Sequence, residues 1–246
     1  MSKIILENVN KEFNLGNKRQ GIIRFILDFR DRKRILKVLN NITFKAEDGE
    51  IVGIIGHNGC GKSTLLRVIA GIYNIDSGKI KCKGEPVLIS GLDNGMQTML
   101  STKENIYLVG SILGLTNKEI KEKYDEILDF AGLKEFEDVL LMKFSSGMKS
   151  RLAFSITINC ISSKKPEILL LDEVFAGGGD EEFKQKSLKR IEELIKSNVT
   201  VILVSHSMEI IKRYCRKVIW MEKGRIKMQG NPKDVVKKYL ESVKKL

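Results

Sequence analysis

Between residues 56 and 64 the chain carries the sequence Gly56-His57-Asn58-Gly59-Cys60-Gly61-Lys62-Ser63-Thr64. It fits the pattern G-x-x-x-x-G-K-[ST], whose glycines let the backbone wrap around phosphate groups and turn its N–H groups toward them. The apolar run Ile51–Ile55 precedes the loop, and the segment Ser63–Ala70 after it has helical character. Because this motif requires a strand before it and a helix after it, the sequence predicts a phosphate-binding loop rather than a chance run of glycines.

Two side chains of the loop have predicted roles in binding a nucleoside triphosphate. We expect Lys62 to reach the β- and γ-phosphates and the Ser63 hydroxyl to ligate Mg²⁺. The following helix turns the positive end of its dipole toward the phosphates, and we expect Gly71 to be its C-cap. ATP and Mg²⁺ are therefore the predicted ligands.

Polar side chains follow two further apolar runs, at the points where buried strands are expected to end. Asp172 and Glu173 follow Ile168–Leu171, and His206 comes shortly after Val201–Val204. Because the carboxyl ends of parallel strands share the sheet edge at which the phosphate loop opens, we expect Asp172 to hold Mg²⁺, directly or through water. Glu173 is placed to polarise the attacking water as a general base, and His206 to contact the γ-phosphate or that water. The alternatives are a pair of solvated carboxylates and a capping or core histidine.

The remaining pattern predicts an α/β fold in which a helical lobe interrupts the sheet core. From about Met96 to Ser163 apolar residues recur at three-to-four spacing, among them Leu108, Ile112 and Leu115, as in helices. Other elements are expected at 3–9, 42–46, 168–171 and 200–204 (strands), at about 181–197 and from Asn231-Pro232 onward (helices), and at Lys223-Gly224 (a hairpin turn). We expect one domain, 1–246, with a core of about 1–95 and 164–230, a helical subdomain of about 96–163 and a C-terminal helix of about 231–246.

Composition limits the class of protein. The 246 residues suffice for a large core, and 42% apolar and 30% charged residues are typical of folded globular proteins. The sequence has no run of ~18 apolar residues and no recognisable secretion signal. Four scattered cysteines and two histidines predict no metal cluster and favour reduced thiols in the cytosol. The net charge of +12 suggests an anionic partner, namely nucleic acid, lipid headgroups or a phosphorylated substrate, or else a lysine-rich surface without a specific partner.

A second motif gives the chain a family resemblance. The sequence Phe144-Ser145-Ser146-Gly147-Met148-Lys149-Ser150-Arg151 lies between the helical lobe and the Asp172 strand. It resembles the signature of ATP-binding-cassette (ABC) subunits, usually Leu-Ser-Gly-Gly-Gln, with Ser146 and Met148 as departures. The resemblance implies a phosphate-loop (P-loop) NTPase core with a mixed sheet flanked by helices, an N-terminal antiparallel β subdomain and an inserted α-helical subdomain.

The same resemblance implies a homodimer with ATP at its interface. In the family, the signature of one subunit closes over ATP held by the phosphate loop of the other. Ser145 and Gly147 would then bind the γ-phosphate in trans, from a helix N-terminus that suits anions. A serine N-cap on an ordinary helix is a structural explanation of the same residues, and the two are compatible.

Other positions resemble further parts of the family's site. Phe13 resembles the aromatic residue that stacks on adenine, although a core residue is the alternative. Asp180 resembles the aspartate of the loop that touches the partner subunit, after a glycine run, Gly177–Gly179, that is one residue longer than the family spacing. The family's glutamine between the γ-phosphate and the membrane subunit is expected near 90–93, where this chain has no glutamine.

Within the family, the chain resembles the ATPases of polysaccharide exporters, which move O-antigen, capsule or teichoic acid polymers. The features that carry this resemblance are the form of the signature, Val174-Phe175-Ala176 after Glu173, and an insertion after Phe13. It implies an ATP-hydrolysing subunit at the cytoplasmic face of the membrane, working with an integral-membrane permease on a lipid-linked glycan. Some relatives carry a C-terminal carbohydrate-binding domain, and because the sequence ends at Leu246 we expect none.

Two rival functions remain within the family. One is a different transporter class, either a drug or lipid exporter or an importer. The other is a non-transport ATPase acting on DNA or ribosomes, which the positive charge would suit. Because such proteins usually carry two cassettes or long coiled coils, we expect no nucleic acid partner.

The insertion, residues 17–37, has a pattern of its own. Ile22, Phe25, Ile26 and Phe29 fall at helical spacing among many Lys and Arg residues. A short basic amphipathic helix suits lipid headgroups or an anionic lipid-linked substrate. A surface helix packed on the sheet by its apolar stripe explains the pattern equally well.

Overall fold

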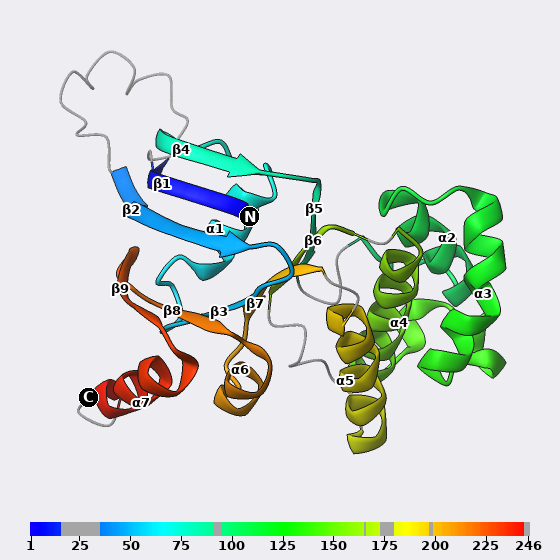
Figure 1. Ribbon diagram of the computed structural model, residues 1–246. Coiled ribbons are helices and arrows are strands. Elements are labelled where there is room, and N and C mark those ends of the chain that lie inside the picture. The colour runs from blue at the N-terminus through cyan, green and yellow to red at the C-terminus, as the bar shows by residue number, and fades with distance from the viewer. Residues whose placement is uncertain (16–34, 91–94, 165, 173–179, 197–198, 244–246) are drawn as a thin grey trace, which may run out of the picture.

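Two β-sheets form the body of the molecule (Figure 1). The computed structural model describes residues 1–15, 35–90, 95–164, 166–172, 180–196 and 199–243. A three-stranded antiparallel sheet has the order β2-β1-β4, and a six-stranded sheet has the order β5-β6-β7-β3-β8-β9. The strands are Ser2–Asn14 (β1), Ile35–Glu47 (β2), Ile51–Ile55 (β3), Ser77–Cys82 (β4), Pro86–Ser90 (β5), Ile168–Asp172 (β6), Thr200–Val204 (β7), Lys217–Glu222 (β8) and Arg225–Gly230 (β9).

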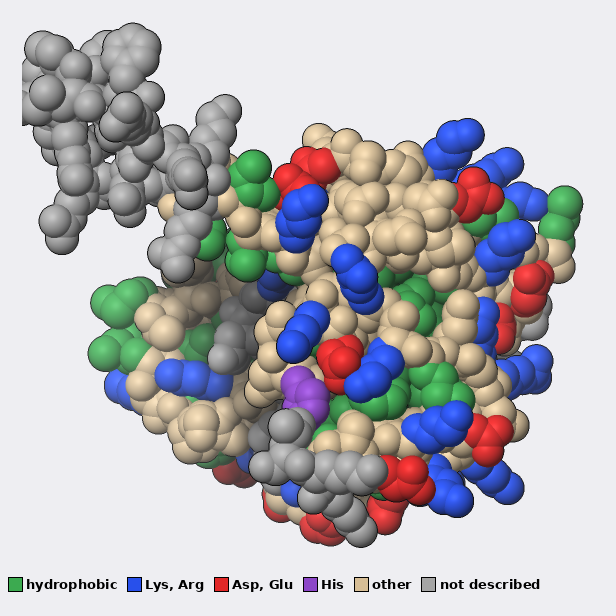
Figure 2. Space-filling model, turned by 90° about the vertical axis from the view of Figure 1, so that its left-hand side faces the viewer, with side chains coloured by type: hydrophobic (Ala, Val, Ile, Leu, Met, Phe, Trp, Pro, Cys, Tyr) green, Lys and Arg blue, Asp and Glu red, His purple; other side chains and the backbone are tan. Residues whose placement is uncertain are grey.

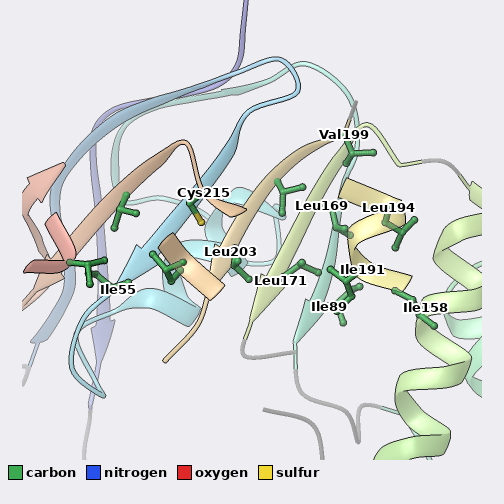
Figure 3. Close-up of a cluster of buried hydrophobic side chains, with 14 of the residues drawn as sticks. Ile55, Ile89, Ile158, Leu169, Leu171, Ile191, Leu194, Val199, Leu203 and Cys215 are labelled. Carbon is green, nitrogen blue, oxygen red and sulfur yellow. The ribbon is translucent and has the colours of Figure 1, made fainter. Parts of the chain in front are cut away.

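The central strands of the six-stranded sheet are covered on both faces, which explains why they are almost entirely apolar. Its first five strands in the order given are parallel, and β9 joins β8 as an antiparallel hairpin. One face, with Ile54 and Leu170, packs against the helix after β3 and against β1 and β2. The other face, with Leu169 and Leu203, packs against helices on the far side of the sheet (Figure 3). Strands buried on both faces carry apolar residues at nearly every position, with Thr200 as the exception, as the sequence predicted for 51–55, 168–171 and 200–204.

The helices divide into two groups. A helical lobe of α2, α3 and α4 stands beside the sheets, while α5, α6 and α7 lie along the face of the six-stranded sheet opposite α1 (Figure 1). Two short 3₁₀ segments, Lys134–Phe136 and Leu141–Lys143, precede α4. The helices are Lys62–Ile69 (α1), Thr102–Ile112 (α2), Asn117–Ala131 (α3), Ser146–Lys164 (α4), Glu181–Lys196 (α5), Met208–Tyr214 (α6) and Pro232–Val243 (α7).

Helix α4 connects the lobe to the sheet because it is apolar on two sides. Leu152 and Ile156 pack within the lobe, against residues of α2 and α3. Phe154 and Ile158 pack in the core cluster that contains the sheet residues Leu169 and Leu171, and Figure 3 shows Ile158 facing that cluster. A helix that is hydrophobic around its circumference is a buried one. The predicted signature therefore stands at the start of the element that joins lobe and core.

Two sequence predictions need correction. The C-cap of α1 is Ala70, and Gly71, with φ +72°, is the residue after it. The strands predicted at 3–9 and 42–46 extend well beyond those limits, and the irregular register between β1 and β2 explains why no regular alternation marks the added residues. Most of the insertion 17–37 and all of Gly177–Gly179 lie outside the described residues.

Candidate nucleotide-binding site

The predicted phosphate loop connects the end of β3 to the start of α1. Gly61 is the N-cap of α1 and adopts φ +105°, so no side chain caps the helix. The N–H groups of the first helical turn have no partner within a helix. They point, with the positive end of the helix dipole, toward the space above the loop, which suits an anion such as phosphate. His57, Asn58 and Gly59 form the exposed part of the loop, and Ser63 and Thr64 are half-buried.

Lys62 lies across the inside of this loop. Its side chain is 6% exposed, and Nζ donates hydrogen bonds to the carbonyl oxygens of Gly56 (2.9 Å) and His57 (3.1 Å). These bonds hold the ammonium group among the loop's N–H groups, where it can also pair with phosphate oxygens. Burial raises the pKa of the neighbouring Cys60 thiol, although the Lys62 charge acts in the opposite direction. Cys60 is therefore a neutral packing residue of the loop.

The loop rests on the β8–β9 hairpin and on β2. The N–H of Gly224, in the hairpin turn, donates to the carbonyl of Cys60 at 3.1 Å. A Cβ atom on Gly56 would lie 2.3 Å from the carbonyl oxygen of Met221, and one on Gly61 would lie 2.8 Å from that of Val38. Backbone thus meets backbone at both positions. Only glycine fits there, which gives the two outer glycines of the motif a structural role besides phosphate contact.

We expect Gly56→Ala to distort the phosphate loop where it packs against the main chain of Met221. Gly56 has φ +152°, which L-residues rarely adopt, and its neighbour at 2.3 Å is main chain that cannot rotate away. Strain of this kind is worth about 1–3 kcal/mol, so the melting temperature should fall and ATP affinity should drop by about ten-fold or more. Thermal unfolding and equilibrium dialysis with labelled ATP measure both effects. Gly59→Ala is the control for the close contact, because Gly59 also has a positive φ (+75°) but a Cβ there meets no atom within 4 Å. Equal ATP affinity in Gly56→Ala and the wild type would contradict the close packing.

The strand register brings the predicted polar residues to one edge of the sheet. Asp172 pairs with Val204 of β7, and Val204 pairs with Ile54 of β3, two residues before Gly56. Asp172 is 8% exposed, and His206, just after β7, is exposed. The carboxylate of Asp172 and the hydroxyl of Ser63 are the oxygen ligands that suit Mg²⁺, which binds through one or two protein groups together with phosphates. Glu173 lies outside the described residues.

The predicted signature occupies the N-terminus of α4. Ser145 is an N-cap, because its Oγ accepts a hydrogen bond from the N–H of Met148 at 3.2 Å. Ser145 and Ser146 are exposed, and a Cβ on Gly147 would meet only Ser145 Oγ, at 3.9 Å. Helix α4 belongs to the lobe, which stands to one side of the two sheets that enclose α1 (Figure 1). One subunit therefore presents the signature and the phosphate loop as two separate surfaces.

Phe13 and Asp180, the other two candidates, have clear structural neighbours. The half-buried ring of Phe13 meets the edge of Tyr73 at a centroid distance of 5.4 Å. One carboxylate oxygen of Asp180 accepts from the N–H of Phe183 at 2.9 Å and so caps α5. Its other oxygen lies 3.5 Å from Nη1 of Arg151. This ion pair ties the signature helix to the start of α5.

The sequence does not predict these supporting contacts, and neither Arg151 nor Tyr73 has a predicted role. For the first pair it shows only that a basic residue lies five positions after Ser146, where α4 begins, and this does not indicate which residue is its partner. For the Phe13–Tyr73 contact the sequence offers no indication, because β1 and the segment after α1 meet only through the sheet packing.

Comparison with known proteins gives this arrangement a family. The family model for ABC transporters matches residues 39–176, which include the phosphate loop, the signature and the β6 strand end. The chain belongs to the ABC transporter family. Among solved structures, a dimeric ATP-binding cassette in a post-hydrolysis state, bound to ADP and Pi, has the same fold: TM-score 0.71, 20% identity, and coverage of 93% of this chain and 98% of that one.

Two curated relatives are similar to the chain over nearly its whole length. It is 38% identical over 244 residues to the teichoic acids export ATP-binding protein TagH of Bacillus anthracis, covering 99% of this chain and 43% of that protein. It is 35% identical over 246 residues to the O-antigen export system ATP-binding protein RfbB of Klebsiella pneumoniae, covering 98% of each. The chain spans 41–43% of the length of the Bacillus and Lactococcus teichoic acid export relatives.

The Lys and Arg side chains of this ABC subunit are spread over several parts of its surface. On the face shown in Figure 2, Lys and Arg side chains are spread widely, with Asp and Glu side chains between them. Exposed lysines also belong to β4, α3 and α7, which lie in different parts of the fold. Among the helices that the structure describes, none is long and apolar enough to cross a bilayer.

Proposed function

We propose that the chain is the ATP-binding and ATP-hydrolysing subunit of an exporter of lipid-linked polysaccharide of the O-antigen, capsule or teichoic acid type. The observation that carries the ATPase part is the meeting of phosphate loop, Asp172 and His206 at one sheet edge. The export part is supported by the near full-length similarity to the O-antigen export protein of Klebsiella pneumoniae. A separate integral-membrane permease would provide the path, and the chain would act at the cytoplasmic face of the membrane.

The residues divide the proposed chemistry among them. Lys62 and the loop N–H groups bind the β- and γ-phosphates, and Phe13 stacks on adenine. Asp172 and Ser63 hold Mg²⁺, which when bound neutralises phosphate charge. Glu173 and His206 orient a water molecule for in-line attack on the γ-phosphate, and Glu173 accepts its proton. Lys62 stabilises the negative charge that develops on the phosphoryl oxygens.

The site is completed by a second copy of the chain. Ser145, Ser146, Gly147 and Met148 form an exposed or half-buried helix N-terminus whose orientation suits an anion, remote from the loop of the same subunit. Two copies arranged head to tail would place each signature over the other's phosphate loop. The homodimer then holds two ATP·Mg²⁺ between its subunits, and Asp180 faces the partner. Closure of this dimer drives the permease.

Co-purification is the experiment that tests the transporter role. The tagged chain is expected to bring down a polytopic membrane protein from detergent-solubilised membranes. Deletion of the gene for the chain should leave lipid-linked polymer inside the cell. ATPase activity should rise when the pair is reconstituted in liposomes. Stimulation by nucleic acid instead of by the membrane partner would favour the non-transport role, and a drug or amino acid as the stimulating ligand would favour another transporter class.

The insertion offers a second test, on the polymer substrate. Reversing the charges of Arg30, Arg32 and Arg34 is expected to lower polymer export and lipid-stimulated ATPase activity several-fold while basal ATPase activity persists, because anionic headgroups lose their basic partners. The matched control reverses three exposed lysines elsewhere, Lys79, Lys81 and Lys233. If the arginine variant exports polymer as the wild type does, the insertion does not guide the substrate.

A further inference from the structure

The backbone of His57 organises the phosphate loop. Its carbonyl oxygen accepts hydrogen bonds from Nζ of Lys62 at 3.1 Å and from the N–H of Cys60 at 3.3 Å. The position of His57 therefore fixes both the lysine that pairs with phosphate and the turn that leads into α1. Yet the His57 side chain is exposed, in the part of the loop that projects from the fold.

A residue of the C-terminal helix contacts this projecting side chain. The ring of Tyr239, in α7, lies 5.7 Å from the imidazole of His57 between centroids, with the ring planes tilted by 57°. A second aromatic neighbour of Tyr239 is Trp220 of β8, at a centroid distance of 5.5 Å in an edge-to-face arrangement. Burial, with a smaller contribution from Cys60, raises the pKa of Tyr239, so the phenol remains neutral. One aromatic ring thus connects the sheet, through Trp220, to the phosphate loop.

Helix α7 is firmly docked, so it can act as a support. Val235, Val236 and Tyr239 are buried on one side of the helix and belong to the core cluster that contains Trp220. The N-terminus of α7 is capped by Asn231, whose side chain accepts from the N–H of Lys233 at 2.9 Å. Figure 1 shows α7 beside β8, below the sheet. This segment lies beyond the residues 39–176 that the family model matches.

We propose that Tyr239 is a positioning residue for the phosphate loop: its ring, supported by Trp220, holds His57 so that the loop is shaped for nucleotide before nucleotide arrives. The inference rests on the proposed function, since it assumes that the loop binds ATP. A loop that is already ordered loses less conformational entropy on binding, so its affinity for ligand is higher. Tyr239 touches neither phosphate nor the reacting atoms, and it acts through His57.

Trp220 supplies a direct readout, because it is the sole tryptophan of the chain. The full chain is titrated with ATP·Mg²⁺ while Trp220 emission is recorded, and affinity is measured independently by equilibrium dialysis with labelled ATP. Tyr239→Leu removes the aromatic contact and retains an apolar side chain, and Tyr239→Phe retains the ring. Val236→Ala is the matched control, because Val236 is buried in the same helix and belongs to the same core cluster, and shortening it tests whether general loosening of α7 has the same effect.

The wild type and Tyr239→Phe are expected to bind ATP equally and to show the same nucleotide-dependent change in Trp220 emission. In Tyr239→Leu, Kd and KM for ATP should rise about three- to ten-fold, the range of one aromatic contact, while kcat stays within about two-fold. The emission of Trp220 should no longer respond to ATP even at saturation. Val236→Ala should lower the melting temperature and leave Kd near the wild-type value.

A double-mutant cycle tests whether Tyr239 acts through His57. In a His57→Ala background, Tyr239→Leu should change Kd by less than about two-fold, because the contact is already gone. Full additivity, wild-type affinity in Tyr239→Leu, or equal weakening by Val236→Ala would each overturn the positioning role. Failure of the wild-type chain to bind ATP would instead refute the proposed function, so the two failures are distinguishable.

Discussion

Glu173→Gln is expected to bind ATP normally and to hydrolyse it about a hundred- to ten-thousand-fold more slowly than the wild type, the usual effect of removing a general base. Glu173 directly follows Asp172, whose strand β6 ends at the sheet edge where the phosphate loop begins. The amide has the size of the carboxylate but cannot accept the proton of the attacking water. The proposed phosphate binding by Lys62 and the proposed Mg²⁺ binding by Asp172 and Ser63 do not involve this side chain and should be unchanged.

The measurement is the amount of ATP-bound dimer that accumulates when hydrolysis is blocked. With ATP·Mg²⁺ present, Glu173→Gln should elute from a sizing column as a stable dimer, whereas the wild type returns to monomer as it turns ATP over. Asp172→Asn distinguishes the two carboxylates, since loss of the proposed Mg²⁺ ligand should prevent the dimer from forming. Glu182→Gln, a change of the same kind at an exposed position, should behave as the wild type does. Undiminished turnover in Glu173→Gln would refute its role as the base.

The sequence predicted best those strands that have an apolar environment on both faces. Strands β3, β6 and β7 are buried on both faces, so each appears in the sequence as an apolar run with limits close to the observed ones. Strand β1 extends to Asn14 because it pairs with β2 through several register shifts, and irregular pairing leaves no period for a sequence pattern to follow.

The candidate site likewise contains residues that the local sequence predicts and contacts that it does not. The phosphate loop and Asp172 are recognisable because local sequence, a glycine pattern or a strand end, determines their position. The contacts that hold the site, such as Arg151 with Asp180 and His57 with Tyr239, join segments far apart in the chain. Side-chain pairs of this kind arise from tertiary packing, so no local pattern announces them.

Gly147→Asp is expected to leave the folded subunit stable while preventing ATP-dependent dimerisation. The first turn of α4 has no acidic residue, and a Cβ on Gly147 meets no obstacle. An aspartate there interacts favourably with the helix dipole, by about 0.3–1 kcal/mol, and replaces a poor helix former. The melting temperature of the monomer should therefore stay the same or rise. Lys118→Asp is the matched control, because it places the same acid in the first turn of α3.

In the dimer the same carboxylate should face the γ-phosphate of ATP bound to the partner. Like charges about 4 Å apart near a protein surface repel by about 4 kcal/mol, which is close to a thousand-fold in an equilibrium constant. Combined with Glu173→Gln, Gly147→Asp should thus abolish the ATP-dependent dimer on the sizing column, and in the wild-type background it should reduce ATPase activity to background. Lys118→Asp should change neither.

Mixing two inactive variants decides whether the signature acts on its own subunit or on the other. A Gly147→Asp subunit retains its phosphate loop, and a Lys62→Ala subunit retains its signature, each in the Glu173→Gln background. If the signature acts in trans, the heterodimer has one complete site made from the two intact halves, and ATP should produce a dimer that neither variant forms alone. If it acts in cis, every site in the mixture contains a defect. If ATP produces no heterodimer from the mixture, a site shared between two subunits is refuted, because the intact phosphate loop of one variant and the intact signature of the other would not form a site together.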